Sequence, residues 1–173
     1  MSRIAVVGLG NVLMGDDALG PYVVRVLEAE YEFPSNVEVQ DLGTPGLDLS
    51  PHVAGVDVLV LVDTVLSDAR PGTIRTYRKD EILKHPPQQR LSPHDPGVKE
   101  ALLTADFEGT GPREVFLVGV VPENAGMGTG LTAAVRDAVP KAVEAVVAEL
   151  GRLGAPPVRR ASPRKADIWW EAR

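Results

Sequence analysis

GLGNVLMGDDALG occupies positions 8–20 and directly follows the apolar run Ile4–Val7. A short β-branched run that ends in Gly-x-Gly predicts a first strand that turns sharply at its carboxyl end. A dinucleotide-binding loop would place a third glycine where Leu13 stands and would receive a pyrophosphate at the following helix N-terminus. Asp16 and Asp17 instead place carboxylates there, and each would repel a phosphate by roughly 1 kcal/mol or more at contact range. The loop is therefore expected to meet a cation or a hydrogen-bond donor.

Size and composition are typical of one acidic globular domain. The chain has 173 residues, 44% of them hydrophobic and 24% charged, with a net charge of -6. This negative balance argues against a nucleic-acid surface, which needs clustered Lys and Arg. The chain has no cysteine, which excludes disulfides, thiolate zinc sites and cysteine nucleophiles. The first apolar run is too short for a signal peptide or a membrane span, so a cytoplasmic protein without membrane insertion is expected.

Strand-like segments alternate with helical ones along the chain. Strands are predicted at residues 3–7, 37–41, 56–62, 73–77 and 115–120. The first, third and fifth are almost continuously apolar, as is typical of strands covered on both faces. A helix is expected from about Pro21 to Glu30, a short one over 98–105, and a long one after the predicted N-cap Thr132.

This alternation predicts an α/β fold: a three-layer α/β/α sandwich around a mostly parallel, twisted five-stranded sheet. The segment 73–77 follows the preceding strand too closely for a helical crossover, so it is expected to be an antiparallel edge strand. Residues 1–153 are predicted to form a single domain. Residues 154–173, a Pro/Arg-rich extension with Trp169 and Trp170, are expected to be poorly ordered, with partner docking as the less favoured alternative.

Three candidate site residues fall beyond the carboxyl ends of predicted strands, where open parallel sheets place their functional groups. Asp17 follows the first strand, Asp63 ends the third, and His94 lies in the proline-rich loop 91–97. Two carboxylates and an imidazole suit a borderline divalent cation such as Ni, Zn, Fe or Co better than Mg or Ca. Three protein ligands also leave coordination positions open for a substrate.

Each of these residues also has a structural explanation when taken alone. Asp17 is well placed to be an N-cap or a first-turn acid of a helix. Asp63 suits a turn after a buried strand, and His94 an ordinary loop. Spacing alone therefore makes the metal site a hypothesis. The chain has neither a GxSxG elbow nor an HExxH motif, so serine and zincin mechanisms lack support.

At these residues the sequence resembles the maturation endopeptidases of nickel–iron hydrogenases. The family opening Gly-x-Gly-Asn-x-Leu-x-x-Asp-Asp/Glu-x-x-Gly stands at 8–20, its acid after the third strand is Asp63, and its Ser-Pro-His loop is at 92–94. The segments 118–123 and 130–132 also look like family segments. The likeness runs in the same order over about residues 3 to 151.

The resemblance implies a hydrolase, an aspartyl- or metal-dependent endopeptidase of hydrogenase maturation, in which Asp17, Asp63 and His94 are both the catalytic and the nickel-binding residues. Its partner would be the hydrogenase large-subunit precursor, from which it removes a C-terminal peptide after nickel insertion. The nickel would be carried by that precursor rather than held tightly by the free enzyme.

Two alternatives stay open at this point. Peptidyl-tRNA hydrolases also show Gly-Leu-Gly-Asn after a first strand, but Pro-Gly usually follows where this chain has Val12-Leu13. The acidic balance also fits a tRNA ligand poorly. The other alternative is a non-catalytic nickel-sensing or chaperone module, which would use Asp17, Asp63 and His94 only to dock its partner.

Overall fold

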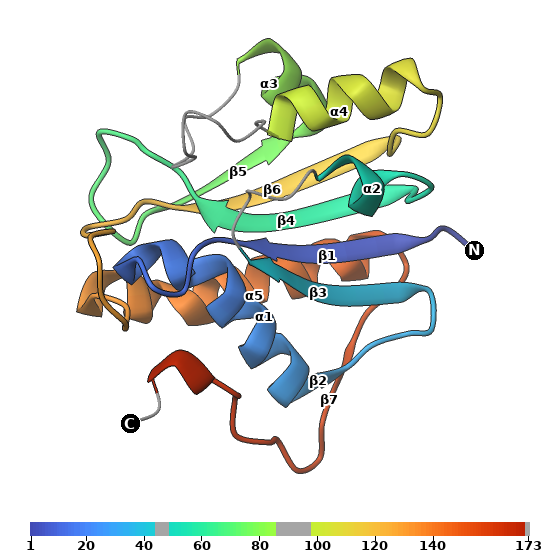
Figure 1. Ribbon diagram of the computed structural model, residues 1–173. Helices are drawn as coiled ribbons and strands as arrows, with labels where there is room; N and C mark the ends of the chain where they lie inside the picture. Colours follow the sequence, from blue (N-terminus) through green and yellow to red (C-terminus); the bar gives the residue numbers. More distant parts are fainter. Residues whose placement is uncertain (44–48, 86–97, 172–173) are drawn as a thin grey trace.

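The computed structural model describes residues 1–43, 49–85 and 98–171, and a five-stranded sheet forms its centre (Figure 1). The strand order is β3-β1-β4-β6-β5. Their bounds are β1 (Ile4–Leu9), β3 (Val37–Gly43), β4 (Val58–Thr64), β5 (Ile74–Arg78) and β6 (Glu114–Val120). β1, β3, β4 and β6 pair in parallel, whereas β5 pairs antiparallel with β6 at the edge. The predicted mostly parallel sheet with one antiparallel edge strand is confirmed.

Helices cover both faces of this sheet, as the three-layer prediction requires (Figure 1). On one face lie α1 (Leu19–Glu30) and α5 (Ala133–Arg152). On the other lie α2 (Ser50–Val53), α3 (Lys79–Lys84) and α4 (Val98–Phe107). Within the described ranges, no helix is both long and apolar enough to cross a membrane.

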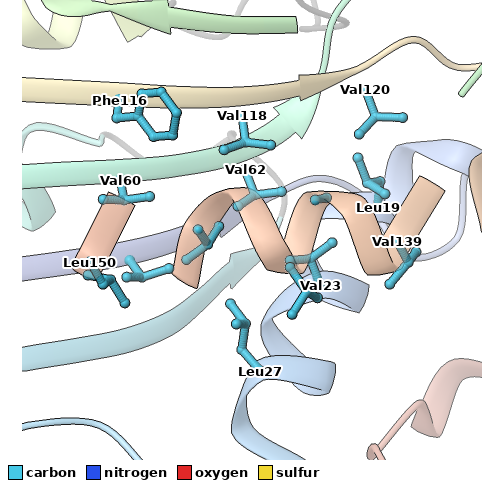
Figure 2. Close-up of a cluster of buried hydrophobic side chains, with 14 of the residues drawn as sticks. Leu19, Val23, Leu27, Val60, Val62, Phe116, Val118, Val120, Val139 and Leu150 are labelled. Carbon is cyan, nitrogen blue, oxygen red and sulfur yellow. The ribbon is translucent and has the colours of Figure 1, made fainter. Parts of the chain in front are cut away.

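The alternation of side chains along the strands fills two hydrophobic clusters. Ile4 and Val6 of β1 belong to the α1/α5 cluster, while Ala5 and Val7 belong to the opposite one. In the first cluster, α1 and α5 pack on β4 and β6 through the side chains labelled in Figure 2. Burying each Val or Leu completely stabilises the fold by roughly 1.5–3 kcal/mol. The carboxyl ends of the parallel strands are thereby held together at one edge.

Glycines allow the chain to pass very close to these strand ends. Gly20, in the first turn of α1, lies so near that a Cβ there would overlap the carbonyl oxygens of Leu9 and Val62. Gly10 has a φ of 148°, and a Cβ there would overlap the carbonyl oxygen of Asp17. The glycines of the opening motif therefore bring the start of α1 directly against the ends of β1 and β4.

In the tail after Gly154, which the sequence predicts to be poorly ordered, the structure contains one short strand and one 3-10 helix. β7 (Val158–Arg159) pairs antiparallel with β2 (Tyr31–Glu32), which follows α1. The 3-10 helix η2 (Trp169–Glu171) then places Trp170 against Tyr22, with ring centroids 6.4 Å apart, and only 5% of Trp170 is exposed. Burial of this large side chain in the α1/α5 cluster explains the defined course of residues 154–171.

Candidate active site

Asp17 lies in the short 3-10 helix η1 (Gly15–Ala18), between β1 and α1. Its Oδ2 accepts a hydrogen bond of 3.1 Å from the backbone N–H of Asn11, and its Oδ1 accepts one of 3.2 Å from the Thr64 hydroxyl. Only 9% of Asp17 is exposed. The N-cap of α1 is Ala18, so Asp17 is not the N-cap considered in the sequence analysis. Its carboxylate instead faces the end of β4.

Asp63 lies inside the end of β4, which runs two residues further than the predicted segment 56–62. The pairing of β1 with β4 ends at Gly8 and Val62, whereas Asp63 and Thr64 still pair with Gly119 and Val120 of β6. Oδ1 of Asp63 accepts a hydrogen bond of 2.7 Å from the backbone N–H of Thr64. Asp63 is 3% exposed. The structural role considered for Asp63 is therefore present in part, because its carboxylate binds the next amide.

Thr64 connects the two candidate acids. Its backbone N–H donates to Asp63 and its hydroxyl donates to Asp17, and the residue itself is completely buried. The two carboxylates thus meet around one residue at the carboxyl edge of the sheet. Both acids are nearly buried and bind the same residue. Carboxylate oxygens are metal ligands, so the residue types of this pair fit a metal ion.

His94, the third predicted ligand, lies in residues 86–97, outside the described part of the chain. Within residues 1–43, 49–85 and 98–171, no group of three or more His, Asp or Glu side chains is arranged to hold a metal ion. A three-ligand site built on Asp17 and Asp63 therefore needs a residue from the rest of the chain, where His94 is located. The role of His94 stays a prediction.

Asp16 behaves differently from Asp17, which sequence reasoning did not anticipate. It is completely buried, and its carboxylate accepts hydrogen bonds of 2.9 Å from the backbone N–H groups of Glu123 and Asn124. It also accepts from the N–H of Thr132 at 2.7 Å and from the Thr132 hydroxyl at 2.9 Å and 3.0 Å. Asp16 thus meets hydrogen-bond donors and fastens the loop between β6 and α5.

Thr132 occupies the N-cap position of α5, as predicted, but its side chain does not cap that helix. Its hydroxyl is directed to Asp16 instead. The signal available in the sequence was the presence of two adjacent acids in one turn, since neighbouring side chains in a tight turn point in different directions. Two adjacent acids therefore predict different roles for Asp16 and Asp17, but they do not show which residue each acid binds.

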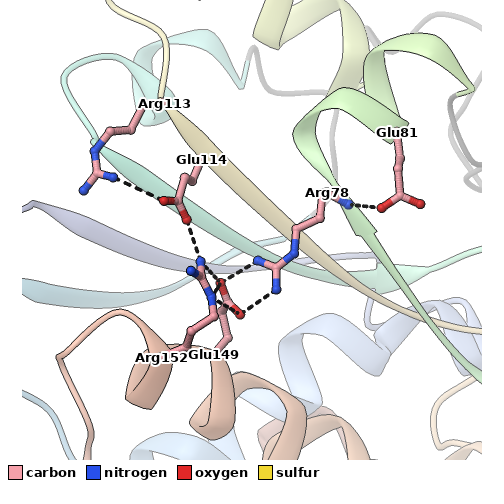
Figure 3. A network of polar contacts seen from close by, with 6 residues as sticks. All are labelled: Arg78, Glu81, Arg113, Glu114, Glu149 and Arg152. Carbon is pink, nitrogen blue, oxygen red and sulfur yellow. Dashed lines mark hydrogen bonds and ion pairs between the residues drawn. The ribbon is translucent and has the colours of Figure 1, made fainter.

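A second polar network lies at the opposite edge of the sheet, where the parallel strands begin (Figure 3). Arg78 donates to both oxygens of Glu149, at 2.6 Å and 3.0 Å. Arg152 donates to both Glu149 and Glu114, and Glu114 is the first residue of β6. Burial alone would raise the pKa of Glu149, but the hydrogen bonds and charges of Arg78 and Arg152 outweigh it and lower the pKa. This network ties α5 to the sheet and is remote from the carboxyl edge.

Known protein families and characterised proteins include relatives of this chain. The family model of the hydrogenase maturation proteases matches residues 21–149. The hydrogenase 2 maturation protease of Escherichia coli K12 is 36% identical over 168 residues, which cover 95% of this chain and 98% of that protein. The hydrogenase expression/formation protein HupM of Azotobacter chroococcum is 36% identical over 166 residues, covering 95% of this chain and 78% of that protein.

Solved structures show the same relationship. The structure of the hydrogenase maturating endopeptidase HybD from E. coli matches with a TM-score of 0.83 and 34% identity, covering 92% of this chain and 98% of that chain. A hydrogenase maturation protease HycI from Thermococcus kodakarensis, at 22% identity and a TM-score of 0.67, shares the fold. The chain belongs to the hydrogenase maturation protease family.

Proposed function

We propose that this protein is the endopeptidase that removes the C-terminal peptide from a nickel–iron hydrogenase large-subunit precursor after nickel has been inserted. The observation that carries the proposal is the meeting of Asp17 and Asp63 around Thr64 at the carboxyl edge of the sheet. Membership of the hydrogenase maturation proteases supports the reaction class and the partner. The carboxylate oxygens of Asp17 and Asp63 can act as metal ligands, which supports the recognition of nickel.

In this proposal the nickel is part of the substrate. The carboxylates of Asp17 and Asp63, together with the imidazole of His94, recognise the ion while the precursor's own ligands still hold it. Three ligands leave coordination positions for groups of the precursor. The bound ion would polarise the carbonyl of the bond to be cleaved and favour attack by water.

The surrounding residues orient the two acids. The N–H of Asn11 and the hydroxyl of Thr64 each engage one oxygen of Asp17, so its carboxylate is held in one orientation. The N–H of Thr64 does the same for one oxygen of Asp63. Because the two carboxylates are already oriented, they need little reorganisation during the reaction. Their charges therefore stabilise the reacting groups more effectively than the charges of mobile side chains would.

The free enzyme is expected to hold metal weakly. Its three ligands leave the remaining coordination positions to groups of the precursor, so a free ion is held by fewer protein ligands than an ion carried by the precursor. A site that kept its own ion would not report whether the precursor had been loaded. We place this reaction in the cytoplasm, with the large-subunit precursor as the partner.

The test compares nickel-loaded with metal-free precursor, each incubated with the purified protein and followed by intact mass. Loss of the C-terminal peptide from the loaded precursor alone is the expected result. Cleavage of the metal-free precursor, or of casein, would contradict nickel recognition. Binding of the loaded precursor without any loss of mass would instead support the non-catalytic nickel-sensing module.

A further inference from the structure

Two apolar residues, Leu13 and Met127, lie on neighbouring segments at the carboxyl edge of the sheet. Leu13 lies between β1 and η1, and Met127 between β6 and α5. The N–H of Gly128 donates to the carbonyl of Leu13 at 2.8 Å, and the N–H of Gly15 donates to the carbonyl of Gly128 at 2.9 Å. Met14 and Gly128 thereby form a parallel bridge. Leu13 and Met127 directly precede this pair, so their backbones run side by side.

Both side chains are open to solvent. Leu13 is 56% exposed and Met127 is 91% exposed. In the core clusters that the described residues form, neither side chain takes part. A single exposed apolar residue is ordinary on a protein surface, whereas neighbouring ones beside a site indicate contact with another molecule. Neither core packing nor metal binding accounts for an apolar residue at either position.

The two segments are held in place before any partner arrives. The buried carboxylate of Asp16 accepts hydrogen bonds from Glu123, Asn124 and Thr132, on both sides of Met127 in the loop. The backbone N–H of Asp16 also donates to the carbonyl of Asn124 at 2.9 Å. A surface that is already ordered loses little conformational entropy on binding, which favours affinity.

Asn11 connects this surface to the candidate active site. Its side-chain oxygen accepts a hydrogen bond of 2.9 Å from the N–H of Leu13, and its own N–H donates to the carboxylate of Asp17. Leu13 is therefore positioned by the same residue that orients Asp17. A chain bound at Leu13 therefore contacts a segment that is hydrogen-bonded through Asn11 to Asp17.

We propose that Leu13 and Met127 form the surface that binds an apolar segment of the precursor polypeptide next to the bond that is cleaved. This proposal rests on the proposed function, since it assigns the polypeptide contact of the same site. The acids of the site can hold the metal, but they offer no apolar contact to the chain around it. An acidic segment is disfavoured there, because Asp17 and the net charge of -6 would repel it.

The test measures KM and kcat for the nickel-loaded precursor with the wild type, Leu13→Ser, Met127→Ser and the double variant. The matched control is Phe107→Ser, because Phe107 is 95% exposed. It lies at the end of α4, on the face of the sheet opposite to α1 and α5. Met127→Leu keeps an apolar side chain and serves as the conservative variant. The melting temperature of every variant is measured alongside, and little change is expected at such exposed positions.

The double variant is expected to raise KM about tenfold with kcat nearly unchanged, as loss of apolar contact in a bound complex predicts. Phe107→Ser should match the wild type, and Met127→Leu should show a smaller rise in KM than Met127→Ser because it keeps an apolar side chain. An unchanged KM in the double variant, or an equal rise with Phe107→Ser, would overturn the proposal.

A binding titration with fluorescently labelled, nickel-loaded precursor separates this proposal from the proposed function. If the wild type binds without cleaving and the double variant binds about tenfold more weakly, the surface is supported and only the proposed cleavage fails. If the wild type cleaves and the double variant binds equally well, the surface assignment fails and the proposed function stands.

Discussion

The hydroxyl of Thr64 donates a hydrogen bond of 3.2 Å to Oδ1 of Asp17, although the two residues are 47 positions apart in the chain. The N–H of the same Thr64 donates to the neighbouring Asp63. One fully buried residue at the end of β4 therefore sets the orientation of both candidate acids. The pairing of β1 with β4 ends at Gly8 and Val62, and beyond it the side chain of Thr64 binds Asp17 of η1.

Thr64→Val keeps the shape of the side chain and removes its hydroxyl. We expect a loss of stability of about 1 kcal/mol, because a buried hydrogen bond to a carboxylate is removed. We also expect a clear fall in kcat for the nickel-loaded precursor, since Asp17 loses one of its orienting donors. Steady-state cleavage together with urea unfolding measures both effects. Thr64→Ser retains the hydroxyl and should keep most of the activity, and equal losses in both variants would speak against the orienting role.

Asp63→Asn is expected to abolish precursor processing and leave the fold intact. The substitution conserves volume but removes a charged oxygen ligand, so metal recognition suffers much more than packing. Intact-mass analysis of the precursor and a thermal unfolding curve provide the two readouts. Aggregation, or a large drop in melting temperature, would favour a purely structural role for Asp63.

Asp16→Asn and Asp17→Asn form a matched pair of adjacent substitutions. Asp16→Asn should destabilise the protein by about 2–4 kcal/mol, because an amide nitrogen would face the N–H donors that Asp16 now accepts from. Asp17→Asn should cost less stability, because the Thr64 hydroxyl can turn to accept from the new amide group, and it should remove processing activity. Urea denaturation and precursor cleavage, measured on both proteins, distinguish the two roles. Similar stability in the two variants would contradict the division between them.

Trp170→Ala is expected to destabilise the protein by about 3 kcal/mol, because it removes a buried aromatic side chain that packs on Tyr22. Trp169→Ala is the neighbouring control: Trp169 is 55% exposed and packs edge-on against Trp170, so its effect should be smaller, about 1 kcal/mol. The free energy of unfolding in urea measures both. Equal effects would show that the tail is not anchored through Trp170.

The network around Glu149 predicts a dependence of stability on pH. The pKa of Glu149 is lowered in the folded protein by hydrogen bonds from Arg78 and Arg152, against the effect of burial. A lowered folded-state pKa contributes stability above the unfolded-state pKa of about 4.3, and that stability is lost as the pH falls through the folded value. Glu149→Gln should therefore lose stability at neutral pH and respond less to acidification below about pH 4. Unfolding curves across the acidic range measure this, and parallel pH profiles would contradict it.

The amino-acid pattern alone predicts the layers of the fold and the edge of the sheet at which the candidate acids lie. Continuous apolar runs at β1, β4 and β6 are typical of strands covered on both faces, and the short connection before β5 leaves no room for a helical crossover. Once the strands are parallel, Asp17 and Asp63 must lie at their carboxyl ends. These features follow from local patterning and connection length, and both can be read from the amino-acid sequence.

The different roles of the neighbouring acids Asp16 and Asp17 are set by packing between distant segments, which the sequence pattern does not reveal. The partner of Asp16 is Thr132, 116 positions away, and the partner of Asp17 is Thr64. The course of the tail was likewise decided by Trp170 meeting Tyr22 across the fold. Such pairings depend on how distant segments pack, because a carboxylate or an indole takes its role from the donors and surfaces that folding brings to it.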